Sequence, residues 1–232
     1  MKITWLGHAS FLLESGDVRI ITDPYDPDDL NLLPVTEPAD IVVRSSDDDI
    51  AHAYIDSIPK PFELITTTEI VDNGTKVKGI HFRAVPSQES FYKEGGYRDN
   101  ALYRFTLEGI TITHMGDVGN PLSASQLAAF EETDILFALA GGHPTIGLDD
   151  LETVISTLKP KLVIPMHFRV PGPRFFMLPV TDFTDRYPES TVQFAGSSTI
   201  SVNVAELGSQ QKETRITVLE PKNVKPEEKP AG

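Results

Sequence analysis

The sequence predicts an α/β fold formed by a single domain. The first half of the chain contains pairs of apolar or alternating segments separated by turn residues, which is the pattern of β-hairpins. Helical patterns begin after residue 120, and a strand–helix–strand order over residues 134–167 predicts a parallel βαβ unit. We expect the domain to span residues 1–220. Residues 221–232, which are rich in Pro, Lys and Glu, are expected to form a disordered tail.

The elements of the first half are marked by alternation and by turn residues. The segments FLLE and VRIIT flank a Gly-containing turn at residues 15–17 and predict a hairpin. ADIVV at residues 39–43 is a short apolar run that predicts a buried strand. Asn73-Gly74 predicts a second hairpin between TEIVD and KVKGIHFRAVP, and Glu108-Gly109 predicts a third within ALYRFTLEGITITHMGD.

The second half alternates helices with buried strands. Ser123 or Ser125 can cap a helix over QLAAFEE, and DILFALAGG predicts a buried strand. LDDLETVISTL carries apolar residues at i, i+3, i+4 and i+7, which predicts a helix that Pro160 ends. KLVIPMHF then predicts a buried strand that runs into His167.

The composition disfavours several classes of function. The 232 residues carry 34 acidic and 20 basic side chains, and the net charge of −14 argues against binding to nucleic acid or to an anionic membrane surface. The absence of cysteine excludes disulfides, a cysteine nucleophile and a thiolate metal site. The sequence shows no signal-peptide layout and no apolar run of about 20 residues, so we expect a cytoplasmic protein. A small molecule is the expected partner, and a homo-oligomer is left open.

Polar residues follow several of the predicted buried strands. SSDDD at residues 45–49 follows ADIVV, Asp117 follows GITITHMG, His143 follows DILFALAGG, and His167 follows KLVIPM. Because sites in α/β folds are built at strand ends, these residues are candidates for one site. Carboxylate and imidazole groups are ligands of divalent cations, so the pattern predicts a metal site. A solvated turn is the alternative for the three adjacent Asp residues.

Six stretches of the chain carry a resemblance to a known family, and they are MKITWLGHASFLLESG, RIITDP, AVPS, ITHMGDVGNPLSASQL, LAGGHPTIGLDDLETVISTLKPKLVIPMHF and TRITVLEP. In this order they resemble the metallo-β-lactamase superfamily, in particular the small bacterial metal-dependent hydrolases that include ascorbate-6-phosphate-lactonase-like proteins. The resemblance implies a four-layered αβ/βα sandwich with a metal site at one edge. It also implies that Asp117 is the carboxylate that bridges two metals and that His167 is the last histidine ligand.

The sequence departs from that family at the His-x-His-x-Asp-His signature, which should follow ADIVV but reads VVRSSDDDIAHAY. An alignment without a gap puts Asp48 at the second histidine position. A one-residue slip brings His52 to the last histidine position, and a two-residue shift places Asp48 and Asp49 at Asp-His. The first histidine pair is missing in each register. The resemblance also implies that Gln88 replaces a histidine ligand, because relatives carry Pro-Ser-Tyr-His where this chain has VPSQES.

The remaining histidines divide between the site and the core. His8 ends the first strand and matches a family histidine near the site, with packing as an equal alternative. His143 is a candidate for the pocket lining, because the two glycines before it allow the backbone to approach a ligand closely. His114 alternates in phase with apolar residues and is expected in the core, and His81 is expected to be structural.

Two functions of different classes follow. The first is a metal-dependent hydrolase that acts on a small ester, lactone or phosphoester through a single or altered metal site. The second is a catalytically degenerate member that binds a ligand or partner without hydrolysis. A serine nucleophile is weaker, because the strand–elbow–helix context that it needs is missing.

The first function requires one divalent cation, Mn, Fe, Zn or Mg, whereas the second requires none. The candidate residues of the hydrolase fall into three groups. They are Asp117, His167, Asp48 and His52 as metal ligands, Asp48 and Asp49 as catalytic carboxylates, and His8, Gln88 and His143 as pocket-lining residues.

Overall fold

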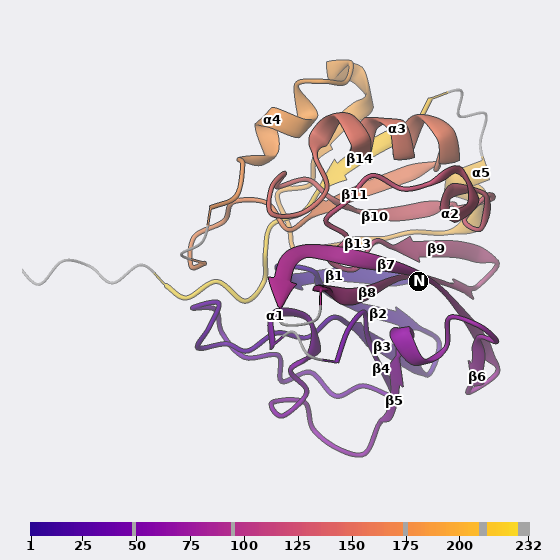
Figure 1. Cartoon of the computed structure of the whole chain (residues 1–232), viewed down its shortest axis with the longest axis vertical. Helices are drawn as coiled ribbons and strands as arrows, with labels where there is room; N and C mark the ends of the chain where they lie inside the picture. Colours follow the sequence, from indigo (N-terminus) through magenta and orange to yellow (C-terminus); the bar gives the residue numbers. More distant parts are fainter. Residues whose placement is uncertain (48–49, 94–95, 174–175, 209–212, 227–232) are drawn as a thin grey trace, which may run out of the picture.

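The computed structural model describes residues 1–47, 50–93, 96–173, 176–208 and 213–226. Its framework is two mixed β-sheets stacked face to face, of six and eight strands (Figure 1). Helices α2 (Ala124–Ala128) and α3 (Leu148–Leu158) lie outside the larger sheet (Figure 1). The predicted α/β sandwich of two packed sheets is confirmed.

The smaller sheet has the strand order β13-β1-β2-β3-β4-β5. The pairs β13-β1, β1-β2 and β2-β3 are antiparallel, and the pairs β3-β4 and β4-β5 are parallel. The hairpin predicted over FLLE and VRIIT is β2-β3, and the buried strand predicted at ADIVV is β4, so both predictions are confirmed. The strands are β1 Lys2–Gly7, β2 Ser10–Ser15, β3 Val18–Thr22, β4 Ile41–Arg44, β5 Glu63–Thr66 and β13 Thr199–Ser201.

The larger sheet has the strand order β12-β14-β11-β10-β9-β8-β7-β6. Its β6 to β9 part is an antiparallel meander, and the remaining pairs are parallel. The predicted βαβ unit is β10-α3-β11, and it is confirmed. The strands are β6 Thr75–Val77, β7 Ile80–Lys93, β8 Gly96–Leu107, β9 Ile110–His114, β10 Ile135–Leu139, β11 Leu162–Met166, β12 Val192–Phe194 and β14 Arg215–Val218.

One predicted hairpin is wrong in its position. The turn between β6 and β7 lies at Lys78 and Gly79, and TEIVD contains a 3-10 helix, η1 (Thr67–Glu69). Gly74 instead closes a turn, since its N–H bonds to the Ile70 carbonyl at 2.8 Å. A Cβ at Gly74 would lie 2.6 Å from the Phe82 carbonyl oxygen, so close backbone approach explains this glycine.

The helices are short. Of the two that the sequence predicts, α3 ends before Pro160 as expected, whereas α2 ends at Ala128, within QLAAFEE. Ser123 is the N-cap of α2 and forms a capping box with Gln126, which decides between the two candidate serines. Pro160 follows α3, whose C-cap Lys159 has a left-handed backbone. The remaining helices are α1 Ile50–Ala53, α4 Val180–Thr184, α5 Val204–Gly208 and the 3-10 helix η2 Glu189–Thr191. No helix of the described residues is long and apolar enough to cross a membrane.

Two apolar clusters hold the layers together. The larger lies between the sheets and under α3, and it contains Phe11, Phe137 and Trp5. The smaller packs the other face of β1–β4 against the loop that follows β3, with Tyr25 and Leu30 among its members. Because each sheet buries apolar side chains on its inner face, the two sheets are fixed relative to each other, and so are residues at their common edge.

The first residues of the predicted tail are held by backbone hydrogen bonds. The Lys222 N–H bonds to the Trp5 carbonyl at 3.0 Å, and the Asn223 N–H bonds to the Leu6 carbonyl at 3.1 Å. Asn223 also accepts the Leu33 N–H at 2.7 Å. These backbone bonds hold residues 222–223 against β1, which composition alone does not reveal. Residues 227–232 lie outside the described part of the chain.

Candidate metal centre

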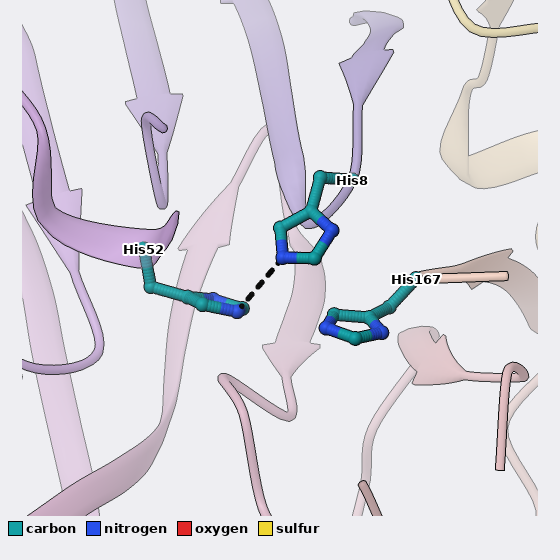
Figure 2. A group of neighbouring side chains, drawn as sticks. All are labelled: His8, His52 and His167. Atoms are coloured by element: carbon teal, nitrogen blue, oxygen red, sulfur yellow. Dashed lines mark hydrogen bonds between the residues drawn. The ribbon is translucent and has the colours of Figure 1, made fainter. Parts of the chain in front are cut away.

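Three histidines that are far apart in the sequence meet at the edge shared by the two sheets. His8 follows β1, His52 lies in α1, and His167 follows β11. Each histidine offers one ring nitrogen, and these three nitrogens all lie within 4.8 Å of one another. Figure 2 shows the three side chains pointing toward one another. Among the described residues, this is the group of three that could hold a metal ion.

Asp117 adds a carboxylate to this group. It follows β9, and its Oδ1 lies 3.6 Å from His52 Nε2 and 3.5 Å from His167 Nε2. The three histidines are at most 3% exposed, and Asp117 is 6% exposed. The four side chains therefore form a polar cluster that is shielded from bulk water.

The separations fit ligands of a single ion. Two ligands of a tetrahedral zinc ion, at bond lengths of about 2.0–2.1 Å, lie roughly 3.3–3.4 Å apart. His8 Nε2 and His52 Nε2 are 3.2 Å apart, and the two Asp117 distances are close to the same value. Imidazole-rich donor sets suit zinc, iron, copper and nickel better than magnesium. The residues present thus fit a divalent transition metal.

Asp23 orients one of the histidines. It is completely buried after β3, and its Oδ2 lies 3.0 Å from His52 Nδ1. Asp23 also accepts hydrogen bonds from the Ser45 N–H and hydroxyl and from the Tyr103 hydroxyl. Because His52 donates its Nδ1–H to the Asp23 carboxylate, it turns Nε2 towards His8, which is how protein carboxylates orient metal-binding histidines.

Backbone strain and backbone hydrogen bonds fix the other histidines. His8, Asp23 and His167 have positive φ angles of 52°, 38° and 54°, a region that residues with side chains seldom adopt. The His8 carbonyl accepts the His167 N–H and the Trp5 indole N–H, each at 3.0 Å. A bond that joins His8 to His167 directly links the two sheets at the cluster.

The electrostatics favour the neutral form of two imidazoles of the cluster, those of His8 and His167. Burial, followed by the neighbouring His167 and His52, holds the pKa of His8 well below its ordinary value. Burial and His52 lower the pKa of His167 to about 3. Burial raises the pKa of Asp23, but His114, His52 and Ser45 outweigh it and leave the pKa below its ordinary value. Neutral imidazole is the form that binds a metal, so the folded chain is prepared for one.

The structure brings together four of the predicted site residues, namely His8, His52, Asp117 and His167. Of the three alignment registers, the one-residue slip is the one that puts His52 at a histidine-ligand position, and His52 lies in the cluster. Asp48 and Asp49 lie outside the described residues, and Asp47 is exposed. Within the described residues, SSDDD therefore contributes no carboxylate to the cluster.

Gln88 and His143 do not join the four. Gln88 is exposed and lines a separate cavity of about 370 Å³ beside α2. Its neighbour Glu89 carries a buried carboxylate that the sequence did not predict. Glu89 is only 1% exposed, and its Oε2 lies 3.9 Å from Arg98 Nη1. His143 is exposed, and the first of the two glycines before it serves another purpose, because a Cβ at Gly141 would lie 2.0 Å from the His167 carbonyl oxygen.

One further expectation can be compared with the structure, and one residue of the site was not expected. His114 is a buried core histidine, as predicted, with both ring nitrogens hydrogen bonded. Asp23, which directly follows the predicted strand VRIIT, is not among the predicted site residues. A carboxylate at the end of a buried strand was the available signal, although its partners Ser45, His52 and Tyr103 become visible only in the folded chain.

Comparison with known proteins defines the class. Residues 2–167 match the family model described as the β-lactamase superfamily domain. A metal-dependent hydrolase of Thermoplasma acidophilum is 28% identical over 187 residues, which cover 72% of this chain and 83% of the relative. One of Pyrococcus furiosus is 29% identical over 195 residues, which cover 72% and 84%.

The solved structures agree. A proposed zinc-dependent hydrolase of the metallo-β-lactamase superfamily from Thermotoga maritima superposes with a TM-score of 0.73 at 29% identity, covering 94% of this chain and 97% of that one. The chain belongs to the metallo-β-lactamase superfamily. The expected class, a metal-dependent hydrolase, is confirmed by these relatives.

Proposed function

We propose that the chain hydrolyses a small ester, lactone or phosphoester with the help of one divalent cation held by His8, His52, His167 and Asp117. The observation that supports this assignment most directly is the convergence of three buried imidazoles, two of which lie 3.5–3.6 Å from the Asp117 carboxylate. Within the superfamily, the shared stretches around His8, Asp117 and His167 support the ascorbate-6-phosphate-lactonase-like branch, with an altered histidine signature.

The bound cation would polarise the substrate oxygen and lower the pKa of a water molecule to about 7, which makes hydroxide available at neutral pH. The chain's own residues do the rest. His52 is held by Asp23, and His8 and His167 are held through a shared backbone bond, so the donors need little reorganisation. Burial of the four donors excludes bulk water and strengthens their interaction with the charge of the cation.

The donor chemistry also narrows the choice of metal. Of the four ions expected from the sequence, magnesium is disfavoured, because it prefers oxygen ligands and retains several waters. Zinc and iron suit imidazole donors, whereas manganese, like magnesium, suits oxygen donors. Zinc gives the best agreement with the separations of 3.2–3.6 Å. We therefore propose zinc or iron, and not a carboxylate-dominated magnesium site.

The test compares two histidine variants. His52→Ala should lower the metal content of the purified protein from about one ion per chain to near zero. His143→Ala, which removes an exposed histidine outside the cluster, should leave the metal content unchanged. Elemental analysis and competitive titration measure both. Equal metal content in the two variants would place the cation elsewhere and overturn the assignment.

A second candidate function is binding without hydrolysis. The observation that favours it is the near-complete burial of the cluster, because a substrate has to reach the donors. Stoichiometric metal together with turnover of a panel of small esters, lactones and phosphoesters supports the hydrolase. Stoichiometric metal with no turnover of the panel, and a raised melting temperature with an unreacted panel member, supports the binding protein.

A further inference from the structure

His114 connects two segments of the chain that carry proposed metal ligands. Its Nε2 lies 2.9 Å from the Ala9 carbonyl oxygen, and its Nδ1 accepts the Gly116 N–H at 2.9 Å. Since a carbonyl oxygen can only accept, Nε2 must carry the proton, which leaves Nδ1 free to accept from Gly116. One tautomer satisfies both bonds.

The two bonded segments are neighbours of the metal centre. Ala9 directly follows His8 in the turn between β1 and β2 of the smaller sheet. Gly116 directly precedes Asp117 in the loop after β9 of the larger sheet. A single imidazole therefore spans from one sheet to the other and fixes the separation of a histidine donor and a carboxylate donor.

The ring cannot easily change its orientation. It stacks on Tyr103, with centroids 4.8 Å apart and planes 11° from parallel. Phe11 and Phe137 meet it edge to face on other sides, with centroids 6.3 Å and 5.7 Å away. The packed rings hold both nitrogens in the directions of their partners.

The Gly116 segment also cannot shift freely. Gly116 has a φ of 60°, and a Cβ there would lie 2.5 Å from Asn100 Oδ1 and 2.7 Å from Ser45 Cβ. The Asp117 N–H donates to the same Asn100 Oδ1 at 3.0 Å. Neighbours surround this turn closely, and the bond from Gly116 N to His114 Nδ1 is one of the contacts that fix its position.

We propose that His114 is a positioning residue of the metal centre, which holds the His8 turn and the Asp117 loop at the distance that one cation requires. This inference rests on the proposed function, since it assumes that His8 and Asp117 belong to one site. His114 itself is not a ligand, as both of its nitrogens are used by backbone groups.

Packing alone is the competing explanation, and substitutions separate the two. His114→Phe keeps an aromatic ring in the aromatic cluster and removes both hydrogen bonds. His114→Gln can retain a donor near Ala9, and His114→Asn can retain an acceptor near Gly116. Thr113→Val is the matched control, because it removes a buried hydrogen bond of the same strand, from Thr113 Oγ1 to Thr133 Oγ1 at 2.7 Å.

The readouts are the zinc dissociation constant, by competition with a chromophoric chelator, and the visible absorption spectrum of the cobalt(II)-loaded protein. Partners that orient metal ligands typically contribute about 10–100-fold to metal affinity. We expect His114→Phe to weaken zinc binding by about that factor and to change the cobalt spectrum. The Gln and Asn variants should fall between it and the wild type, and Thr113→Val should match the wild type in both readouts.

The outcomes are distinct. A folded His114→Phe protein with wild-type affinity and spectrum overturns the positioning role and leaves the proposed function intact. If His114→Phe does not fold, wild-type affinity and spectrum in both the Gln and Asn variants overturn it equally. A wild-type chain that takes up no metal overturns the proposed function, and this inference with it.

Discussion

Asp23 and His52 form a buried carboxylate–imidazole pair, with 3.0 Å between Oδ2 and Nδ1 and no exposed surface on either residue. The pair joins the end of β3 to the short helix α1. Two backbone hydrogen bonds join the same segments, from Asp26 N to the Ile50 carbonyl and from Tyr54 N to the Pro24 carbonyl. Helix α1 is thereby fixed on both sides of His52, and its imidazole is presented to His8 in a defined orientation.

Replacing Asp23 by Asn should weaken metal binding about 10–100-fold, because the neutral amide no longer matches the Nδ1 proton of His52 and the donors that surround it. The zinc dissociation constant of Asp23→Asn measures this. Asp17→Asn, which neutralises an exposed carboxylate in the β2-β3 turn, is the control and should bind like the wild type. Equal affinity in the two variants would show that the pair does not position His52.

The metal-free protein should lose stability in acid through its histidines. In the folded chain the pKa of His167 is about 3, whereas the ordinary value is 6.5, because burial and His52 disfavour the charged form. Between these values the unfolded chain binds the proton and the folded chain does not. The stabilisation is therefore complete above about pH 6.5 and is lost as the pH falls towards 3.

Urea unfolding of the metal-free protein at a series of pH values checks this expectation. The free energy of unfolding should decrease steadily from pH 7 to pH 4, and His167→Gln should show a shallower decrease, since Gln does not titrate. His143→Gln, at an exposed histidine, should keep the wild-type slope. If His167→Gln also keeps the wild-type slope, the pKa of His167 is the same in the folded and the unfolded chain.

The cluster should discriminate between metals. At equal concentrations, zinc should raise the melting temperature of the metal-free protein much more than magnesium, because three of the four donors are imidazoles. Zinc at 100 times its dissociation constant adds about 2.7 kcal/mol to the stability. Differential scanning fluorimetry measures the shift, and His52→Ala should lose it. Equal stabilisation by magnesium would point to an oxygen-rich site.

The sequence predicts the framework well because strand and helix patterns are local. Alternation and apolar runs identified β2, β3, β4, β10 and β11, and the period of α3 was unambiguous. The hairpin at Asn73-Gly74 was misplaced because its glycine is required by contact with the distant Phe82 backbone. Such a tertiary reason leaves no trace in the local pattern.

The site was harder to predict, because each of its donors depends on contacts between distant segments. The register of residues 44–52 was ambiguous, and it is α1 that turns His52 inwards while Ile50 stays 52% exposed. The roles of Asp23 and His114 depend on pairs separated by 29 and 105 positions. Chemistry-bearing residue types could be found at strand ends, but their partners could not.

The contact of Gly141 with the backbone of His167 gives a test that does not alter any proposed donor. A Cβ at position 141 would lie 2.0 Å from the His167 carbonyl oxygen and 3.0 Å from its carbonyl carbon, so the backbone of one segment has to move. Overpacking of this kind typically costs about 1–3 kcal/mol. Gly141→Ala should therefore reduce the free energy of unfolding by about that amount.

Because the displaced atom belongs to His167 itself, the variant should also bind zinc at least about tenfold more weakly. Gly208→Ala, at a glycine with no neighbour within 4 Å of the added methyl group, is the control and should leave zinc affinity unchanged. A Gly141→Ala protein that loses stability but keeps wild-type zinc affinity would show that the backbone of His167 can move without displacing its imidazole from the metal.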